Sequence, residues 1–196
     1  PLAILQTKLE LFTEEHPAMD AETAGLVSSL REQLDRLTAL VRTLLEMSNL
    51  QSVSRTDHIA LAPLVEEILT DLTPLAQKNN ISLQQDCEEM GMVGSDALIY
   101  RLVFNLVENG IKYNRPGGAV RVTLQQEKQT AVLRVADTGP GIPADCRESI
   151  FQPFFRVDKS RSREMGGVGL GLALVREIAV LHGGSVTVES SSENGT

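Results

Sequence analysis

The spacing of apolar residues changes once along this 196-residue chain, and that change constrains the fold more than any other feature. Up to about residue 48 the apolar positions recur at intervals of three and four, which is the period of an amphipathic helix. From about residue 58 short β-forming runs alternate with helical patterns. The chain is therefore predicted to be an α+β protein, with an N-terminal helical hairpin before an α/β sandwich that has a mixed sheet and three main helices.

The hairpin is predicted from two apolar seams in residues 1–48. The first helix carries Leu2, Leu5, Leu9 and Phe12, and the second carries Val27, Leu30, Leu34, Leu37, Val41 and Leu44. Pro17 and Asp20 mark the turn between them. Because so narrow a stripe commonly pairs with a copy of itself, we expect a homodimer through an antiparallel four-helix bundle. Residues 49–57 are polar and are predicted to be a linker.

Residues 58–196 are predicted to form a second domain. Strands are expected over 58–63, 81–86, 119–125, 131–137 and 184–190, and helices over 63–78, 95–113 and about 169–182. The strands at 119–125 and 131–137 are adjacent in sequence and are expected to form an antiparallel hairpin. Residues 138–168 are rich in Gly, Pro, Arg and Ser and predict a long loop, of the kind that is usually a functional lid or disordered.

Composition excludes several classes of function. A net charge of −8 argues against a general nucleic-acid binder. The sequence contains no signal peptide and no run near the roughly 20 apolar residues of a membrane span, so no membrane contact is expected. Cys87 and Cys146 lack metal-ligand spacing and are expected to be reduced thiols in the cytoplasm.

The helix predicted over 95–113 carries polar residues that could hold a ligand. Asn105, Asn109 and Lys112 lie within about 60° of each other, opposite the apolar face. Solvent exposure alone explains such a face. Alternatively, amide oxygens are hard ligands for Mg²⁺ and an ammonium group attracts phosphate, so the three residues could hold a metal-bound polyphosphate.

Two glycine-containing stretches follow. In "VADTGPGIP" the glycines would let the backbone approach a flat ligand while Asp137 accepts a hydrogen bond from an exocyclic amine, although the stretch alone also fits a simple turn. "GGVGLGLALV" leads into an apolar helix whose free N–H groups would face an anion, or it is only a glycine-rich helix start. It matches neither a P-loop nor G-x-G-x-x-G, and the H-R-D and D-F-G motifs of protein kinases are absent.

The order of these stretches resembles that of a known family. The asparagine helix, Asp-x-Gly-x-Gly, "FQPFFRVDKSRS" and the glycine-rich helix start resemble the N, G1, F and G2 boxes of sensor histidine kinases. The ATP domain of that family shares the Bergerat fold with gyrase, mismatch-repair and chaperone ATPases. The resemblance covers about residues 58–190 and implies a catalytic ATP-binding domain at 58–196 with a lid at about 138–168. It also implies that residues 1–48 are part of a dimerisation and phosphoacceptor hairpin.

The resemblance also implies roles for individual residues. Asn109 would be the main Mg²⁺ ligand, assisted by Asn105, and Lys112 would contact phosphate. Tyr113 would lie beside the adenine of ATP, and Asp137 would read its amino group. Arg156 completes the implied catalytic set, with Arg156 or its basic neighbours reaching the γ-phosphate. Further implied nucleotide contacts are Gly139, Gly141, Ile142, Phe154, Phe155, Gly167, Val168, Gly169, Leu170, Gly171 and Leu172.

Two further features of the sequence bear on the resemblance. Gly110 stands where the family often has Ala, at a cost of about 1 kcal/mol in a helix interior, and Asn114 stands where it often has Thr or Ser. A cluster of basic residues would help a polyanion bind to an acidic domain, although a solvated loop also explains it. The cluster is Arg156, Lys159, Arg161 and Arg163.

The function implied is that of the cytoplasmic catalytic core of a membrane sensor. It would bind Mg²⁺ and ATP, transfer the γ-phosphoryl group to a histidine, and pass it to an aspartate on a response-regulator receiver domain. The acceptor motif resembles His-Glu-x-x-Thr-Pro-Leu, whose tail matches Pro1-Leu2, so the acceptor is expected five residues before Pro1. This chain should then bind ATP without phosphorylating itself.

The histidines in the chain do not occupy the acceptor position. His16 lies in the turn and His58 lies in the linker or first strand. His182 ends the last helix, where a cation suits the helix dipole.

Two other functions remain open. A Bergerat-fold ATP hydrolase resembles this chain but has a glutamate four residues before the magnesium asparagine, where this chain has Asn105. Glu108 lies about 100° around the helix from Asn109 and is poorly placed to activate water. A nucleotide-binding module that only regulates a partner is the non-enzymatic alternative.

Overall fold

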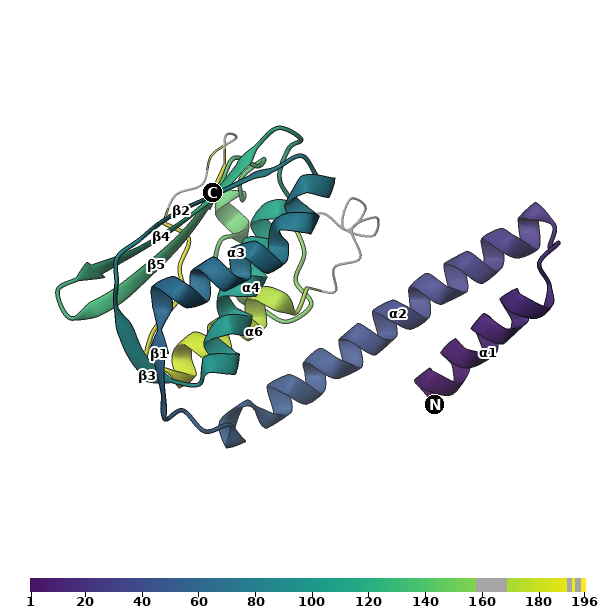
Figure 1. Ribbon diagram of the computed structural model, residues 1–196, viewed down its shortest axis with the longest axis horizontal. Coiled ribbons are helices and arrows are strands. Elements are labelled where there is room, and N and C mark those ends of the chain that lie inside the picture. Colours follow the sequence, from purple (N-terminus) through teal and green to yellow (C-terminus); the bar gives the residue numbers. More distant parts are fainter. Residues whose placement is uncertain (158–168, 190–191, 193–194) are drawn as a thin grey trace.

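A helical hairpin precedes an α/β part in the computed structural model, which describes residues 1–157, 169–189, 192 and 195–196 (Figure 1). The hairpin consists of α1 (Leu2–Glu15) and α2 (Ala21–Asn49). Asp20 caps α2, because its carboxylate accepts hydrogen bonds from the N–H and the hydroxyl of Thr23 at 2.9 and 2.8 Å. These bonds lower the pKa of Asp20. The predicted helical hairpin is confirmed.

The apolar seam of α2 stays largely exposed within one copy of the chain. Leu30, Leu37 and Leu44 are each 45–46% exposed. In Figure 1 the hairpin extends away from the sheet. None of the helices in the described ranges is both long enough and apolar enough to span a bilayer.

The α/β part is a mixed sheet with helices on one face (Figure 1). The strands are β2 (Ser82–Cys87), β4 (Ala119–Glu127) and β5 (Thr130–Asp137), in the order β2-β4-β5, with the first pair parallel and the second antiparallel. The helices are α3 (Leu61–Lys78), α4 (Asp96–Lys112) and α6 (Gly171–Leu181), with α4 packed against the other two. Along β4, Val120, Val122 and Leu124 are fully buried, whereas Arg121 and Gln125 face solvent. This alternation confirms the predicted fold class.

A small antiparallel ribbon joins β1 (Asp57–Ala60) to β3 (Gly91–Gly94). The sequence did not predict β3, because four residues that begin and end in glycine show no alternation. The first predicted strand is shorter than expected, since helix α3 begins at Leu61.

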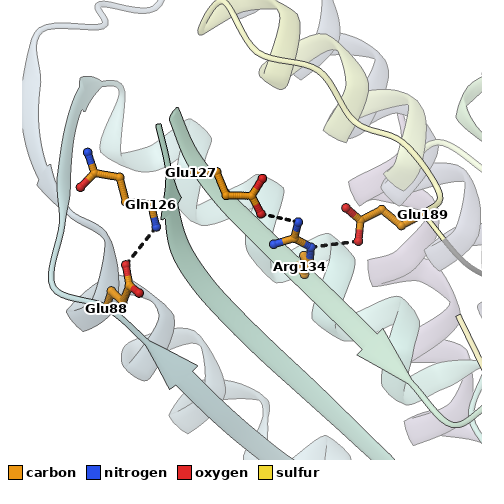
Figure 2. A network of polar contacts seen from close by, with 5 residues as sticks. All are labelled: Glu88, Gln126, Glu127, Arg134 and Glu189. Atoms are coloured by element: carbon orange, nitrogen blue, oxygen red, sulfur yellow. Dashed lines mark hydrogen bonds and ion pairs between the residues drawn. The ribbon is translucent and has the colours of Figure 1, made fainter. Parts of the chain in front are cut away.

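The strand predicted over 184–190 is not found, since residues 184–189 form no strand in the described structure. This segment is held to β5 by side chains instead (Figure 2). Arg134 on β5 pairs with Glu189 at 2.9 Å and with Glu127 at 2.6 Å. The Arg134 guanidinium lowers the pKa of Glu189. Figure 2 also shows Glu88, which accepts a hydrogen bond from the Gln126 N–H at 3.0 Å.

Buried apolar residues interrupt the two segments that were predicted to be a polar linker and a long loop. Each forms 3-10 turns: η1 (Leu50–Ser52) in the first, η2 (Ala144–Cys146) and η3 (Ser149–Phe151) in the second. Leu50 is only 4% exposed and belongs to the core, and η3, in which Ile150 and Phe151 are buried, contacts α6. Single apolar residues in polar stretches carry no period, so the sequence did not reveal these contacts.

Gly110 allows α4 to lie close to the sheet. A Cβ at this buried position would be 3.2 Å from Val120 Cγ2 and 3.6 Å from Asp137 Cβ. An alanine there would press on β4. The departure from the family pattern therefore has a packing reason, and it brings the end of α4 next to Asp137.

The N-terminus of α4 is capped by side chains from distant elements. The Ser95 N–H donates to His182 Nε2 at 3.0 Å, and the Asp96 N–H donates to Asp57 Oδ2 at 3.1 Å. His182 Nδ1 lies 2.8 Å from the Ile178 carbonyl oxygen, to which it donates, because Nε2 acts as the acceptor. His182 is therefore a neutral bridge from α6 to α4, and not the helix-end cation that the sequence predicted.

Replacing His182 by alanine is expected to lower the free energy of unfolding by about 1–2 kcal/mol, because the Ser95 N–H would lose its acceptor. Urea denaturation measures the change. The matched control is His58→Ala on the exposed side of β1, which should change the free energy by less than about 0.5 kcal/mol. Equal effects of the two substitutions would contradict the capping role.

Candidate functional site

Two asparagines on α4 face the N-terminus of α6. A Cβ at Gly171, the first residue of α6, would lie 3.0 Å from Asn105 Oδ1 and 4.0 Å from Asn109 Nδ2. The Asn105 amide donates to the Arg101 carbonyl at 2.7 Å, which fixes the orientation of its oxygen. The residue before α6 is Leu170, which has no polar side chain to cap the helix. The Asn105 amide oxygen, the Asn109 side-chain amide and the positive end of a helix dipole therefore border the same space, an arrangement that suits a cation bound to an anion.

The chain near Phe154 contacts the chain near Gly169, just before α6 begins. The Phe154 N–H donates to the Gly169 carbonyl at 2.8 Å. Gly169 has φ +77°, and a Cβ there would lie 2.7 Å from the Phe155 carbonyl oxygen, so only glycine fits. This hydrogen bond joins the described residues on either side of the segment 158–168. Several predicted residues of this segment lie outside the described residues: Lys159, Arg161, Arg163, Gly167 and Val168.

Arg156 follows Phe155 and is half-buried. Its Nε and Nη2 atoms are buried, and neither has a hydrogen-bond partner in the described part of the chain. Buried N–H groups need an acceptor, and these two have none among the described residues, so the position of Arg156 is compatible with binding an anion such as a phosphate.

Lys112 is occupied by an ion pair. Its ammonium lies 2.8 Å from Glu108 Oε1, one turn earlier on α4, and the two side chains are 33% and 26% exposed. The sequence predicted only a phosphate as the partner of Lys112. A partly exposed pair contributes little to stability, so the ammonium group can exchange this carboxylate for a phosphate oxygen at small cost.

The other predicted half of the site lies where β5 ends beside the C-terminus of α4. Asp137 Oδ1 accepts a hydrogen bond from the Gly139 N–H at 2.7 Å. A Cβ at Gly139 would lie 2.9 Å from the Tyr113 carbonyl oxygen. The Tyr113 side chain is exposed, and the backbone N–H of Tyr113 donates to the Asn109 carbonyl at 3.0 Å. The C-terminal end of α4, the helix that carries the two asparagines, therefore lies beside Asp137 and Gly139.

Burial raises the pKa of the Asp137 carboxyl, and the hydrogen bond from Gly139 opposes the increase. The native protein therefore binds a proton at a higher pH than the unfolded chain. As the pH falls from 7 toward 4, wild type should gain stability relative to Asp137→Asn. Urea denaturation of both proteins across this range measures the difference. A difference that is constant, or that moves in favour of the variant, would contradict the raised pKa.

Four other predicted contact residues differ in how far they are exposed. Leu170 is buried, so only its backbone can face a ligand, and Ile142 and Leu172 are half-buried. Phe154 is exposed with φ +65°. A broad hollow of about 530 Å³ lies on the β1–β3 ribbon, lined by residues 58–60 and 89–93, and it contains none of the predicted residues.

Comparison with known proteins identifies the family. Residues 94–196, which include α4, β5 and α6, match the family of histidine kinase-, DNA gyrase B- and HSP90-like ATPases. The chain belongs to this family. It is 36% identical over 201 residues to the sensor histidine kinase RppB of Synechocystis sp., a match that covers all of this chain and 44% of RppB.

Solved structures show the same architecture. The catalytic domain of histidine kinase ThkA is 27% identical, with a TM-score of 0.63 over 72% of this chain and 91% of that domain. ThkA in complex with the response regulator TrrA is matched with a TM-score of 0.71 over 99% of this chain and 55% of ThkA, at 23% identity, which shows likeness of fold. The chain spans less than half the length of RppB.

Proposed function

We propose that the space between α4, α6 and Asp137 binds ATP with Mg²⁺, and that the chain is the catalytic core of a protein-histidine kinase. The observation that carries the proposal is the convergence of Asn105 and Asn109 on the start of α6 at Gly171, where the preceding Leu170 supplies no capping side chain. Family membership and the similarity to RppB support it. The proposed domains are the hairpin at 1–48, the linker at 49–57 and the ATP-binding domain at 58–196 with its lid at about 138–168.

The metal would be held by few protein atoms. Asn109 and Asn105 each offer one amide oxygen, and Mg²⁺ takes six ligands, so phosphate and water would supply the rest. Bound Mg²⁺ would neutralise charge on the phosphates. Metal binding to this chain should therefore require the nucleotide.

The chain's other residues would orient the nucleotide. Asp137 would accept a hydrogen bond from the amino group of adenine, and Tyr113 would lie beside the ring. The first N–H groups of α6, together with Lys112 and Arg156, would hold the phosphates. The remaining predicted contacts would shape the pocket around the ligand: Gly139, Gly141, Ile142, Phe154, Phe155, Gly167, Val168, Gly169, Leu170, Gly171 and Leu172.

In the proposed reaction the γ-phosphoryl group moves from ATP to a histidine imidazole. The bond from the γ-phosphorus to its bridging oxygen breaks, a P–N bond forms, the imidazole releases its proton and ADP leaves. The chain contributes positioning and charge neutralisation. Glu108 is paired with Lys112, which does not favour a role in activating water for hydrolysis.

The rest of the proposed role concerns partners and location. The exposed seam of α2 would pair with a second copy to form a homodimer. A response-regulator receiver domain would take the phosphoryl group onto an aspartate, a proposal supported by the ThkA–TrrA complex. The core would lie in the cytoplasm as part of a membrane sensor, since the relatives are sensor kinases of greater length.

The test is phosphorylation of an extended chain. A segment with histidine five residues before Pro1 is joined to residues 1–196 and incubated with γ-labelled ATP and Mg²⁺. Acid-labile, base-stable label is expected on this protein, and none is expected on residues 1–196 alone or on a control with glutamine at that histidine. Absence of label despite measurable ATP binding, or equal label on the glutamine control, would refute the kinase proposal.

A further inference from the structure

We propose that Asn114 and Thr138 are positioning residues that set the nucleotide specificity of this site, because they hold Asp137 where it can read an exocyclic amine. The inference rests on the proposed ATP site and adds to it. Neither residue is among the predicted ligand contacts, and neither needs to touch the nucleotide.

The two side chains form a closed ring of hydrogen bonds with one backbone residue. The Thr138 hydroxyl donates to Asn114 Oδ1 at 3.1 Å, and the Asn114 amide donates to the Ala119 carbonyl at 3.0 Å. The Ala119 N–H closes the ring by donating to Thr138 Oγ1 at 2.9 Å. Every polar atom of the two side chains is used, so the ring has one preferred arrangement.

The ring joins the three segments that meet around Asp137. Asn114 follows the last turn of α4, Ala119 begins β4, and Thr138 is the residue after β5. The Thr138 N–H also donates to the Ala119 carbonyl, at 3.1 Å. The ring thus fixes the distance from the end of α4, which carries the asparagines, to the end of β5, which carries Asp137.

The ring holds the chain directly after Asp137, where the sheet ends, while the Asp137 N–H donates separately to the Thr196 carbonyl at 2.8 Å. The pairing of Asp137 with Val120 is the last of the β4–β5 ladder on this side. Beyond it, the backbone is tied to β4 through Thr138, and the Gly139 N–H then orients the Asp137 carboxylate. Recognition of one amino group requires placement within about 0.5 Å, so loss of the ring should affect recognition of the base first.

Asparagine suits position 114 better than the Thr or Ser of the resembled pattern. Its Oδ1 accepts from both the Thr138 hydroxyl and the Arg115 N–H, the latter at 2.9 Å, while Nδ2 reaches the Ala119 carbonyl. A hydroxyl has one polar atom and cannot replace both ends of a carboxamide.

The test compares ATP with inosine triphosphate, which has a carbonyl oxygen in place of the adenine amino group. Dissociation constants for both are measured by calorimetry with Mg²⁺ for wild type, Thr138→Val and Thr138→Ser. Valine keeps the branched shape without the hydroxyl, and serine keeps the hydroxyl. Thr138→Val should lower the preference for ATP over inosine triphosphate about tenfold, mainly by weakening ATP, and Thr138→Ser should keep it within about twofold.

If the ring had a purely structural role, its loss would weaken the binding of both nucleotides by the same factor. The ratio of their dissociation constants would then stay unchanged. An unchanged ratio in Thr138→Val, with wild type binding ATP selectively, would overturn the inference and leave the ATP site standing. Failure of wild type to bind ATP would overturn both. If Thr138→Val does not fold, Asn114→Ala breaks the same ring at its other side chain. The ratio of its affinities for ATP and inosine triphosphate then tests the inference by the same criterion.

Discussion

Asn109→Ala is expected to lower the affinity of the chain for ATP in the presence of Mg²⁺ by at least about 100-fold. The substitution removes an oxygen ligand from a site that has few protein ligands, and even indirect partners of bound metals are worth about 10–100-fold. Isothermal titration with ATP and Mg²⁺ gives the affinity. With a chelator in place of Mg²⁺, wild type and variant should differ much less.

Gln33→Ala is the matched control for this prediction. Gln33 is an exposed carboxamide on helix α2, outside the α/β part, so its loss should leave ATP affinity unchanged. If Asn109→Ala bound ATP as tightly as Gln33→Ala does, Asn109 would not be the metal ligand.

Asp137→Ala should lower the affinity for ATP by a similar factor, about 100-fold. A site built around a hydrogen bond to the ligand loses much of its affinity when that bond cannot form. The Gly139 N–H also loses its acceptor, at a cost of about 1–3 kcal/mol in stability. Inosine triphosphate should lose much less affinity than ATP, since it lacks the amino group that Asp137 would read.

Asp145→Ala is the control for Asp137→Ala, because Asp145 is an exposed carboxylate in η2, eight residues after Asp137. It should bind ATP like wild type. Equal affinities of the two variants for ATP would refute the assignment of Asp137, and thermal unfolding of both separates lost binding from lost folding.

Much of the fold was predictable because it depends on local periodicity. Helical spacing puts Leu98, Ile99, Val103 and Val107 on the apolar face of α4, and all four are buried. The heptads of the hairpin likewise predicted α1 and α2. By contrast, β3 is too short to show a period, and the segment 184–189 alternates like a strand but is tied to β5 by Arg134 and not by a ladder.

The candidate site was predictable only in part. Motif order and helical spacing brought Asn105 and Asn109 to one face, and the structure adds Gly171 beside them. Tertiary contacts were not predictable in this way. The bond between Asn114 and Thr138 spans 24 residues and the bond between Ser95 and His182 spans 87, so neither leaves a local pattern in the sequence.

The central claim is that Mg²⁺ and ATP bind between α4 and the start of α6, and paramagnetic broadening tests it most directly. Mn²⁺ replaces Mg²⁺, and amide signals of the isotopically labelled chain are followed by NMR with and without ATP. The account predicts that ATP causes strong broadening centred on Asn105, Asn109 and Gly171, with little broadening from Mn²⁺ alone. Broadening centred on the β1–β3 hollow around Met92, or broadening that does not depend on ATP, would contradict the account.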